Sequence, residues 1–92
     1  MYKLAISTSG EYVSAAIFEE KLLASFVSKT NKGSTGILLN QINELFDKTK
    51  ASRNDLNALY LDVGPGYYTG LRIGLSVSQG LGAVLGIPII PV

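Results

Sequence analysis

Residues Gly64–Gly86 have the sequence G-P-G-Y-Y-T-G-L-R-I-G-L-S-V-S-Q-G-L-G-A-V-L-G, which holds seven of the ten glycines in this chain of 92 residues. The pattern predicts a tight glycine turn followed by a helix that carries glycines in its interior. Because an interior glycine costs a helix about 1 kcal/mol relative to alanine, several of them imply a compensating gain. We expect that gain to be the close approach of another backbone of the domain, of a partner chain, or of a ligand at the loop.

The length and the apolar fraction of 47% indicate a single globular domain over residues 1–92, with a modest core. The sequence from Ile73 to Val92 is uncharged, but four glycines and two prolines interrupt it, so a buried helix is favoured over a membrane span. No basic segment followed by an apolar one opens the sequence, so no secretory signal is predicted. The absence of cysteine fits a cytoplasmic location.

The net charge of +1 comes from scattered residues and does not indicate a nucleic-acid-binding surface. A loose basic group is interpreted as an ordinary solvated face; it comprises Lys29, Lys32, Lys48, Lys50 and Arg53. With neither histidine nor cysteine, a transition-metal site would have to be built from carboxylates alone. We therefore predict no metal, no cofactor and no membrane partner.

Alternating apolar and polar residues predict three strands near residues 2–7, 11–18 and 22–28. Short turns join these strands, so they form an antiparallel meander. A one-faced amphipathic helix follows; it begins after an N-cap at Ser34 or Thr35 and ends near residue 50.

Residues 58–63 are predicted to form a short apolar strand, which the glycine turn and the second helix follow. Gly86 is the expected C-cap of that helix, and Pro88 stops it. Another buried strand begins at Ile89. The element order is therefore β-β-β-α-β-α-β, which belongs to the α/β class.

This order constrains the sheet, because strand–helix–strand connections are right-handed crossovers. If the strand after the first helix pairs with the first strand, the sheet order is 3-2-1-4-5, and both helices lie on one face. Nothing in the predicted fold covers the other face. Since an exposed apolar sheet is a liability, we expect a C-terminal portion or a partner to cover it.

Ligands of open α/β sheets bind at the point where the strand order reverses. In this sheet the Thr8-Ser9-Gly10 turn and the Gly64–Gly70 loop border that point. Backbone N–H groups and a helix N-terminus there could hold an anion; the alternative is that the glycines only permit a sharp turn. No lysine follows the glycines, so the phosphate-binding P-loop motif is absent. The possible ligand loop comprises Thr8, Ser9, Gly10, Gly64, Gly66 and Thr69.

Metal-assisted hydrolysis on this topology would need carboxylates on the first strand, the first helix and the fourth strand. Ser7 holds the first position, and Glu44 and Asp62 could hold the others. Glu44 points away from the apolar face of its helix, and Asp62 alone is a poor magnesium ligand. A nuclease is therefore not favoured, no catalytic residue is predicted, and we expect loop N–H groups to satisfy Asp62.

The second helix carries an arc of apolar and glycine positions that is wider than the stripe of about 100° expected for burial on one side. One flank can pack on the sheet. The other needs either the first helix alone or another protein molecule, and we favour a protein interface. Only four residues lie opposite the arc: Arg72, Ser76, Gln79 and Ala83. The predicted interface comprises Gly70, Ile73, Gly74, Val77, Gly80, Leu81 and Val84.

The sequence from Gly64 to Val92 resembles the signature of the TsaB (YeaZ) family, G-P-G-S-[F/Y]-T-G-L-R-I-G-L followed by K-G-L-A and G-I-P. The I-S-T-S turn and the L-L-x-x-I-x-x-L pattern of the first helix match as well. The resemblance implies an actin-like, ribonuclease H-like fold, with this chain as its N-terminal lobe, a fragment or a truncated homologue.

The resemblance also implies a function. Members of the family are non-catalytic subunits that pair with TsaD, the enzyme that makes threonylcarbamoyladenosine in tRNA, and they associate through the helices of this lobe. On that basis the chain is expected not to be an enzyme by itself. A TsaD-like catalytic subunit is the expected partner, a homodimer is the alternative, and tRNA is met only indirectly through the complex.

Three positions depart from the family pattern. Ser7 stands where the family has an aspartate, Ser34-Thr35-Gly36 stands where it often has His-Ser-Glu, and Gln79 stands where many members have lysine. The first two weaken the case for independent nucleotide chemistry, and the absence of histidine argues against TsaD itself, which carries metal-binding histidines. The alternative hypothesis is the N-terminal lobe of a nucleotide-binding actin-like kinase or ATPase.

Overall fold

The computed structural model describes residues 2–29, 35–65 and 68–92, and its elements follow the order predicted from the sequence. None of the described helices is long and apolar enough to cross a membrane. The elements are β1 (Tyr2–Ser7), β2 (Tyr12–Phe18), β3 (Leu22–Lys29), α1 (Thr35–Thr49), the short 3-10 helix η1 (Arg53–Asp55), β4 (Leu56–Leu61), α2 (Tyr68–Leu85) and β5 (Ile89–Pro91).

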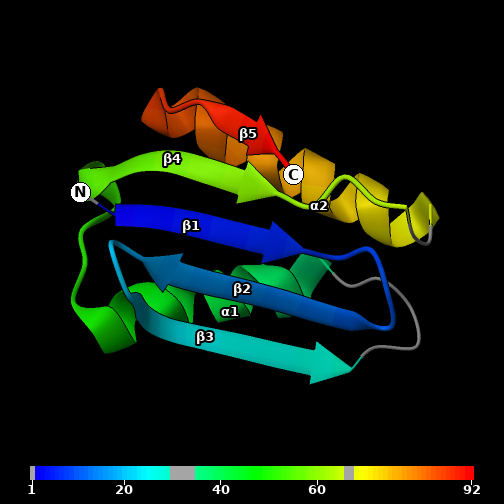
Figure 1. Cartoon of the computed structure of the whole chain (residues 1–92), viewed down its shortest axis with the longest axis horizontal. Helices are drawn as coiled ribbons and strands as arrows, with labels where there is room; N and C mark the ends of the chain where they lie inside the picture. The colour runs from blue at the N-terminus through cyan, green and yellow to red at the C-terminus, as the bar shows by residue number, and fades with distance from the viewer. Residues whose placement is uncertain (1, 30–34, 66–67) are drawn as a thin grey trace.

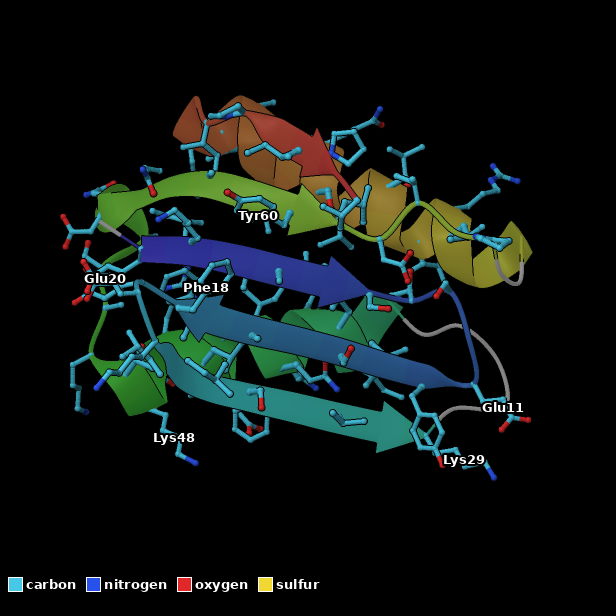
Figure 2. The ribbon with its side chains drawn as sticks, in the orientation of Figure 1. Glu11, Phe18, Glu20, Lys29, Lys48 and Tyr60 are labelled. Carbon is cyan, nitrogen blue, oxygen red and sulfur yellow. The ribbon has the colours of Figure 1, made fainter. Side chains whose placement is uncertain are left out.

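The strands form one sheet in the order β3-β2-β1-β4-β5, as predicted. β2 pairs antiparallel with both β1 and β3, whereas β4 pairs parallel with both β1 and β5. Figure 1 shows α1 and α2 behind the sheet, which confirms that both helices lie on one face. Side chains such as Phe18 and Tyr60 stand on the near face in Figure 2, and no described element covers them.

The fourth strand begins at Leu56, earlier than the sequence pattern indicated. The Ser52 side chain caps η1 by accepting a hydrogen bond from the Asn54 N–H. Because η1 ends at Asp55, the strand begins directly after it, and Leu56 pairs with Tyr2 of β1. The tertiary pairing therefore shifts the strand by two residues from the predicted range of 58–63, and Val63, which was predicted to end it, lies beyond its last residue and is 53% exposed.

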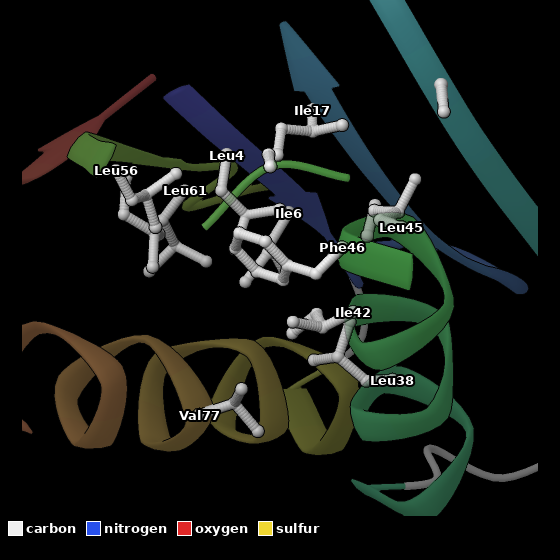
Figure 3. Close-up of a cluster of buried hydrophobic side chains, with 14 of the residues drawn as sticks. Leu4, Ile6, Ile17, Leu38, Ile42, Leu45, Phe46, Leu56, Leu61 and Val77 are labelled. Atoms are coloured by element: carbon white, nitrogen blue, oxygen red, sulfur yellow. The ribbon is translucent and has the colours of Figure 1, made fainter. Parts of the chain in front are cut away.

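The core lies between the sheet and the two helices (Figure 3). Alternate residues of the strands point to this side because side chains in a strand alternate between the two faces. The amphipathic face of α1 meets them, as predicted from its spacing. The largest fully buried apolar side chains are Leu4, Ile17, Leu38, Leu45 and Leu59.

Two residues of the basic group lie over aromatic rings. The Lys48 Nζ is 5.6 Å from the centre of the Phe26 ring, and the Arg53 Cζ is 4.6 Å from that of Phe46. Arg53 also donates a hydrogen bond of 2.6 Å to the Asn43 Oδ1. These cations stabilise the contact of α1 with its neighbours, since a cation over an aromatic face is worth about 0.5–1 kcal/mol at an exposed site.

The second helix ends as the sequence predicted. Gly86 has a φ of 68°, which favours glycine, and both its N–H and that of Ile87 donate to the Gly82 carbonyl oxygen. The chain then turns directly into β5, where the Leu59 N–H donates to the Pro88 carbonyl oxygen. Gly82 lies close to β5, because an added Cβ would lie 3.2 Å from the Ile89 Cδ1 and 3.3 Å from the Ile87 carbonyl oxygen, which is a tight contact.

Candidate functional site

Asp62 is the centre of the polar groups at the reversal of the sheet order. It follows β4, and its carboxylate accepts hydrogen bonds from the hydroxyls of Ser7 (2.8 Å) and Ser9, both in or just after β1. The Gly64 N–H donates to the same carboxylate at 3.0 Å. The prediction that a loop N–H satisfies Asp62 is confirmed, and the two hydroxyls are donors that the sequence reasoning missed.

These hydrogen bonds set the charge of the site. The Ser9 hydroxyl, the Gly64 N–H and the Ser7 hydroxyl, in that order, lower the pKa of Asp62 below its ordinary value of 3.8, against an opposing effect of burial. Asp62 is therefore ionised at neutral pH. A carboxylate beside the glycine turn repels phosphate, so this end of the sheet is a poor anion site despite its backbone N–H groups.

Thr8 and Gly74 explain one of the helix glycines. Thr8 is only 2% exposed, and a Cβ added at Gly74 would lie 2.5 Å from its Oγ1 and 3.2 Å from the Leu61 Cδ1. Gly74 thus lets α2 approach the turn after β1. The hydroxyl of Thr8, one of the predicted ligand-loop residues, lies beneath the helix and does not face an open crevice.

The other residues of the predicted ligand loop are dispersed. Gly10 is exposed, with nothing within 4 Å of the position of an added Cβ. Gly64 has a φ of 105°, in the left-handed region, so glycine is required there for the turn itself. Gly66 lies outside the described residues, and Thr69 lies in the first turn of α2. The geometry therefore favours the interpretation of these glycines as turn residues.

The predicted interface residues of α2 divide into two groups. Gly74 is buried, Val77 belongs to the core at 9% exposure, and Ile73 and Leu81 pack against the core. These four can affect a partner only by holding the helix in place. Gly80 and Val84 are exposed, Val84 at 83%, while Gly70 lies in the first turn of the helix.

The exposed side of α2 contains the four residues predicted to lie opposite the apolar arc, together with Leu75 at 43% exposure. On the neighbouring α1, Leu39 is 45% exposed. We define the helix-layer surface as Gly80 and Val84 of α2 together with Leu39 of α1; Leu75 lies about 140° around the helix from Gly80, on the opposite flank. Of Gly74, Gly80 and Gly82 in α2, only Gly80 has open space where a Cβ would stand.

The sequence reasoning also missed two buried polar residues beneath this layer. The Gln41 Nε2 donates a hydrogen bond of 2.9 Å to the Val13 carbonyl oxygen, which ties α1 to β2. Within the described part of the chain, the Gln41 Oε1 and the Ser78 Oγ are buried without a hydrogen-bond partner. Glu44, by contrast, is exposed on α1, as predicted, and no cluster of three metal-ligating side chains occurs among the described residues.

Comparisons with known proteins place this geometry in a family. The family model for TsaD, tRNA N6-adenosine threonylcarbamoyltransferase, matches residues 21–92. The tRNA threonylcarbamoyladenosine biosynthesis protein TsaB of Buchnera aphidicola subsp. Schizaphis graminum is 35% identical over 94% of this chain and 41% of its own length. The chain belongs to the TsaB (YeaZ) branch of the TsaD family.

Solved structures agree with this assignment. The TsaB-branch protein YeaZ from Pseudomonas aeruginosa matches 99% of this chain with a TM-score of 0.90 and 32% identity, and the match covers 42% of that protein. RuvC from Thermus thermophilus matches with a TM-score of 0.57 and 14% identity, which shows the ribonuclease H-like fold alone. The chain thus spans well under half the length of these TsaB-branch relatives.

Proposed function

We propose that this chain acts in tRNA threonylcarbamoyladenosine biosynthesis as a non-catalytic scaffold that docks a TsaD-type catalytic subunit through the helix-layer surface. Similarity to proteins named for that process supports the pathway. The main support for this docking surface is Gly80, an exposed glycine in the middle of α2. No contact within the described fold requires a glycine at this position.

Gly74, Gly80 and Gly82, which follow the first turn of α2, differ in this respect. Gly74 admits Thr8, and Gly82 admits Ile89, so contacts within the domain offset their cost to the helix. Gly80 loses the same helix propensity, about 1 kcal/mol relative to alanine, and meets nothing within 4 Å of the position of an added Cβ. A partner backbone that approaches α2 closely at this position would supply the missing gain.

The apolar residues near Gly80 suit a protein partner. Val84 lies one helical turn after Gly80 on the same flank of α2 and is 83% exposed, and Leu39 is an exposed large hydrophobic residue on α1. Apolar residues grouped on a surface mark interaction sites more often than isolated ones do. Only one charged residue, Arg72, lies in the α2 segment, so docking there requires little desolvation of charge.

The alternative, a nucleotide-binding lobe of an actin-like kinase or ATPase, fits the groups around Asp62 less well. The hydroxyls of Ser7 and Ser9 are already hydrogen-bonded to Asp62, and that carboxylate is ionised. A nucleotide phosphate would have to displace these bonds and approach a negative charge. This arrangement supports a non-catalytic role.

Co-purification with a tagged TsaD-type threonylcarbamoyltransferase tests the proposal. Gly80→Arg and Val84→Arg place a cation on the helix-layer surface without entering the core, and each is expected to reduce recovery of the complex at least about tenfold. Asn54→Arg adds the same charge at an exposed site in η1 and is the matched control. Val77→Arg is unsuitable because Val77 lies in the core.

Circular dichroism and thermal unfolding verify that each variant is folded. Wild-type recovery by both helix variants would contradict docking at this surface. Threonylcarbamoyl transfer or ATP hydrolysis by the chain alone would contradict the non-catalytic role. Light scattering of the isolated chain distinguishes a homodimer: a dimer that Gly80→Arg dissociates would assign the surface to a second copy.

A further inference from the structure

The helix layer is uncharged where its two helices meet. All charged residues of the chain lie outside residues 33–43 and 73–92, which include the first half of α1 and the part of α2 beyond Arg72. In Figure 3, Leu38 and Ile42 from that half of α1 lie next to α2. The charged residues that border these ranges in the sequence are Lys32, Glu44 and Arg72. The helix-layer surface therefore has the depletion of charge that is typical of the centre of a protein interface.

Small residues make up much of the exposed side of α2. At about 100° per residue, Ser76 and Ala83 point about 40° and 60° away from Gly80, both toward the side of Gln79. All four residues are exposed. Because Ser76 and Ala83 are short, neither holds a partner away from the helix. A partner backbone that approaches Gly80 closely therefore also contacts Gln79, which is the one long polar side chain on this side of α2 beyond Arg72.

Docking at this surface removes water from the Gln79 amide. The amide has two N–H donors and an acceptor oxygen, and a buried polar group that is left without a hydrogen bond weakens a complex. An ionised group of the partner at this place would lose its water as well, without a counter-charge nearby. Arg72, the only charged residue of α2, lies about 10 Å away along the helix axis, since the rise is about 1.5 Å per residue. Gln79 thus favours an uncharged hydrogen-bonding group on the partner.

We propose that Gln79 is a specificity-determining residue of the helix-layer surface, an inference that rests on the proposed docking of a TsaD-type subunit. The chain accepts a subunit that is uncharged where it faces Gln79 and offers an amide, a hydroxyl or a backbone group there. It rejects a related subunit that places a charge at the same position, because that charge would be desolvated without compensation.

Substitutions of opposite charge test the proposal by co-purification with a tagged TsaD-type subunit encoded in the same genome. We expect Gln79→Lys and Gln79→Glu each to reduce recovery of the complex about tenfold, because either charge is desolvated without a counter-charge. Gln79→Met keeps the length of the side chain without the amide and is expected to reduce recovery about fivefold. Recovery of the wild-type complex is expected to change less than about twofold between about 0.05 and 0.5 M salt.

Asn54 supplies the matched controls, since it is an exposed amide residue in η1. Asn54→Lys and Asn54→Glu make the same changes of charge away from the helix-layer surface and are expected to leave recovery unchanged. Glutamine, lysine, glutamate and methionine have similar helix propensities, so the Gln79 variants are expected to fold as the wild type does. Circular dichroism and thermal unfolding verify the folding of each variant.

Several outcomes would overturn the proposal. If the Gln79 variants bind as the wild type does while Gly80→Arg and Val84→Arg lose the partner, docking stands and Gln79 has no part in its specificity. If only one of Gln79→Lys and Gln79→Glu loses the partner, or if wild-type recovery falls steeply with salt, the partner carries a charge there. Wild-type recovery with Gln79→Met alone would remove the hydrogen bond. If none of these helix variants loses the partner, the docking surface itself is wrong.

Discussion

Asp62 joins two parts of the chain that lie far apart in sequence. Its carboxylate accepts the hydroxyl of Ser7, 55 residues away, together with that of Ser9 and the N–H of Gly64. Replacement by asparagine keeps an oxygen for Gly64 but offers no second acceptor for the hydroxyls. Asp62 therefore holds the turn after β1 and the turn after β4 together by hydrogen bonds.

We expect Asp62→Asn to lower the free energy of unfolding by about 1 kcal/mol at neutral pH, since hydrogen bonds to a charged, partly exposed group are lost. Because the folded-state pKa of Asp62 lies below 3.8, its contribution is fully present above that pH and disappears as the pH falls through the folded-state pKa. Urea unfolding of the wild type and of Asp62→Asn, from neutral pH down to the folded-state pKa of Asp62, measures this contribution. A difference in the free energy of unfolding that stays constant into the acid range would contradict the proposed role of the ionised carboxylate.

At the scale of elements, the glycines of α2 have separate roles although they share one helix. Gly74 is the contact point with the turn after β1, Gly82 is the contact point with β5, and Gly80 faces outward. The intrinsic gain from replacing a helix glycine with alanine is similar at every interior position. If the change in the free energy of unfolding on replacement by alanine differs between these sites, the difference therefore reflects the surroundings of each glycine.

Gly74→Ala and Gly80→Ala are consequently expected to have opposite effects on stability. Alanine at Gly74 meets the buried Thr8 Oγ1 at 2.5 Å, so overpacking is expected to lower the free energy of unfolding by about 1–3 kcal/mol. At Gly80 it raises that free energy by up to about 1 kcal/mol. Denaturant unfolding of the two variants provides the measurement. Changes of the same sign would show that the surroundings of the two glycines are not as described.

The sequence predicted the element order, the sheet order and the shared side of both helices, because alternation, helical spacing and crossover handedness determine them. It did not predict how α2 is rotated about its axis. Helical periodicity shows that Val77 and Gly80 belong to one broad arc, but the contacts of Gly74 with Thr8 turn Val77 inward and leave Gly80 outside. Similarly, the serine donors to Asp62 depend on the β1–β4 register, which is a tertiary property.

At the scale of the whole molecule, one sheet separates two surfaces of different character. The helix-layer surface is centred on Gly80, and the opposite side of the sheet carries Phe18, Tyr60 and the exposed Val27. The core lies between the sheet and the helices, so residues on the two surfaces share no side-chain contact across the sheet.

The stability effects of changes on the two surfaces should therefore be additive. We expect the double variant Gly80→Arg/Val27→Asp to differ from the sum of the single variants by no more than about 0.5 kcal/mol in the free energy of unfolding, as is usual for distant sites. Urea unfolding of the four proteins measures this. A larger coupling would indicate that the sheet transmits strain between its faces.

The parallel pairing of β1 with β4 has a consequence for the order of folding. β1 meets β2 through a short turn, but its other neighbour, β4, lies on the far side of β3 and α1 in the sequence. Closing a long loop carries an entropic cost before any contact forms, so the meander can assemble before the β1–β4 pair. During synthesis on the ribosome, one edge of β1 stays unpaired until α1 and β4 have emerged, and this interval is when the nascent chain is most prone to misassociation.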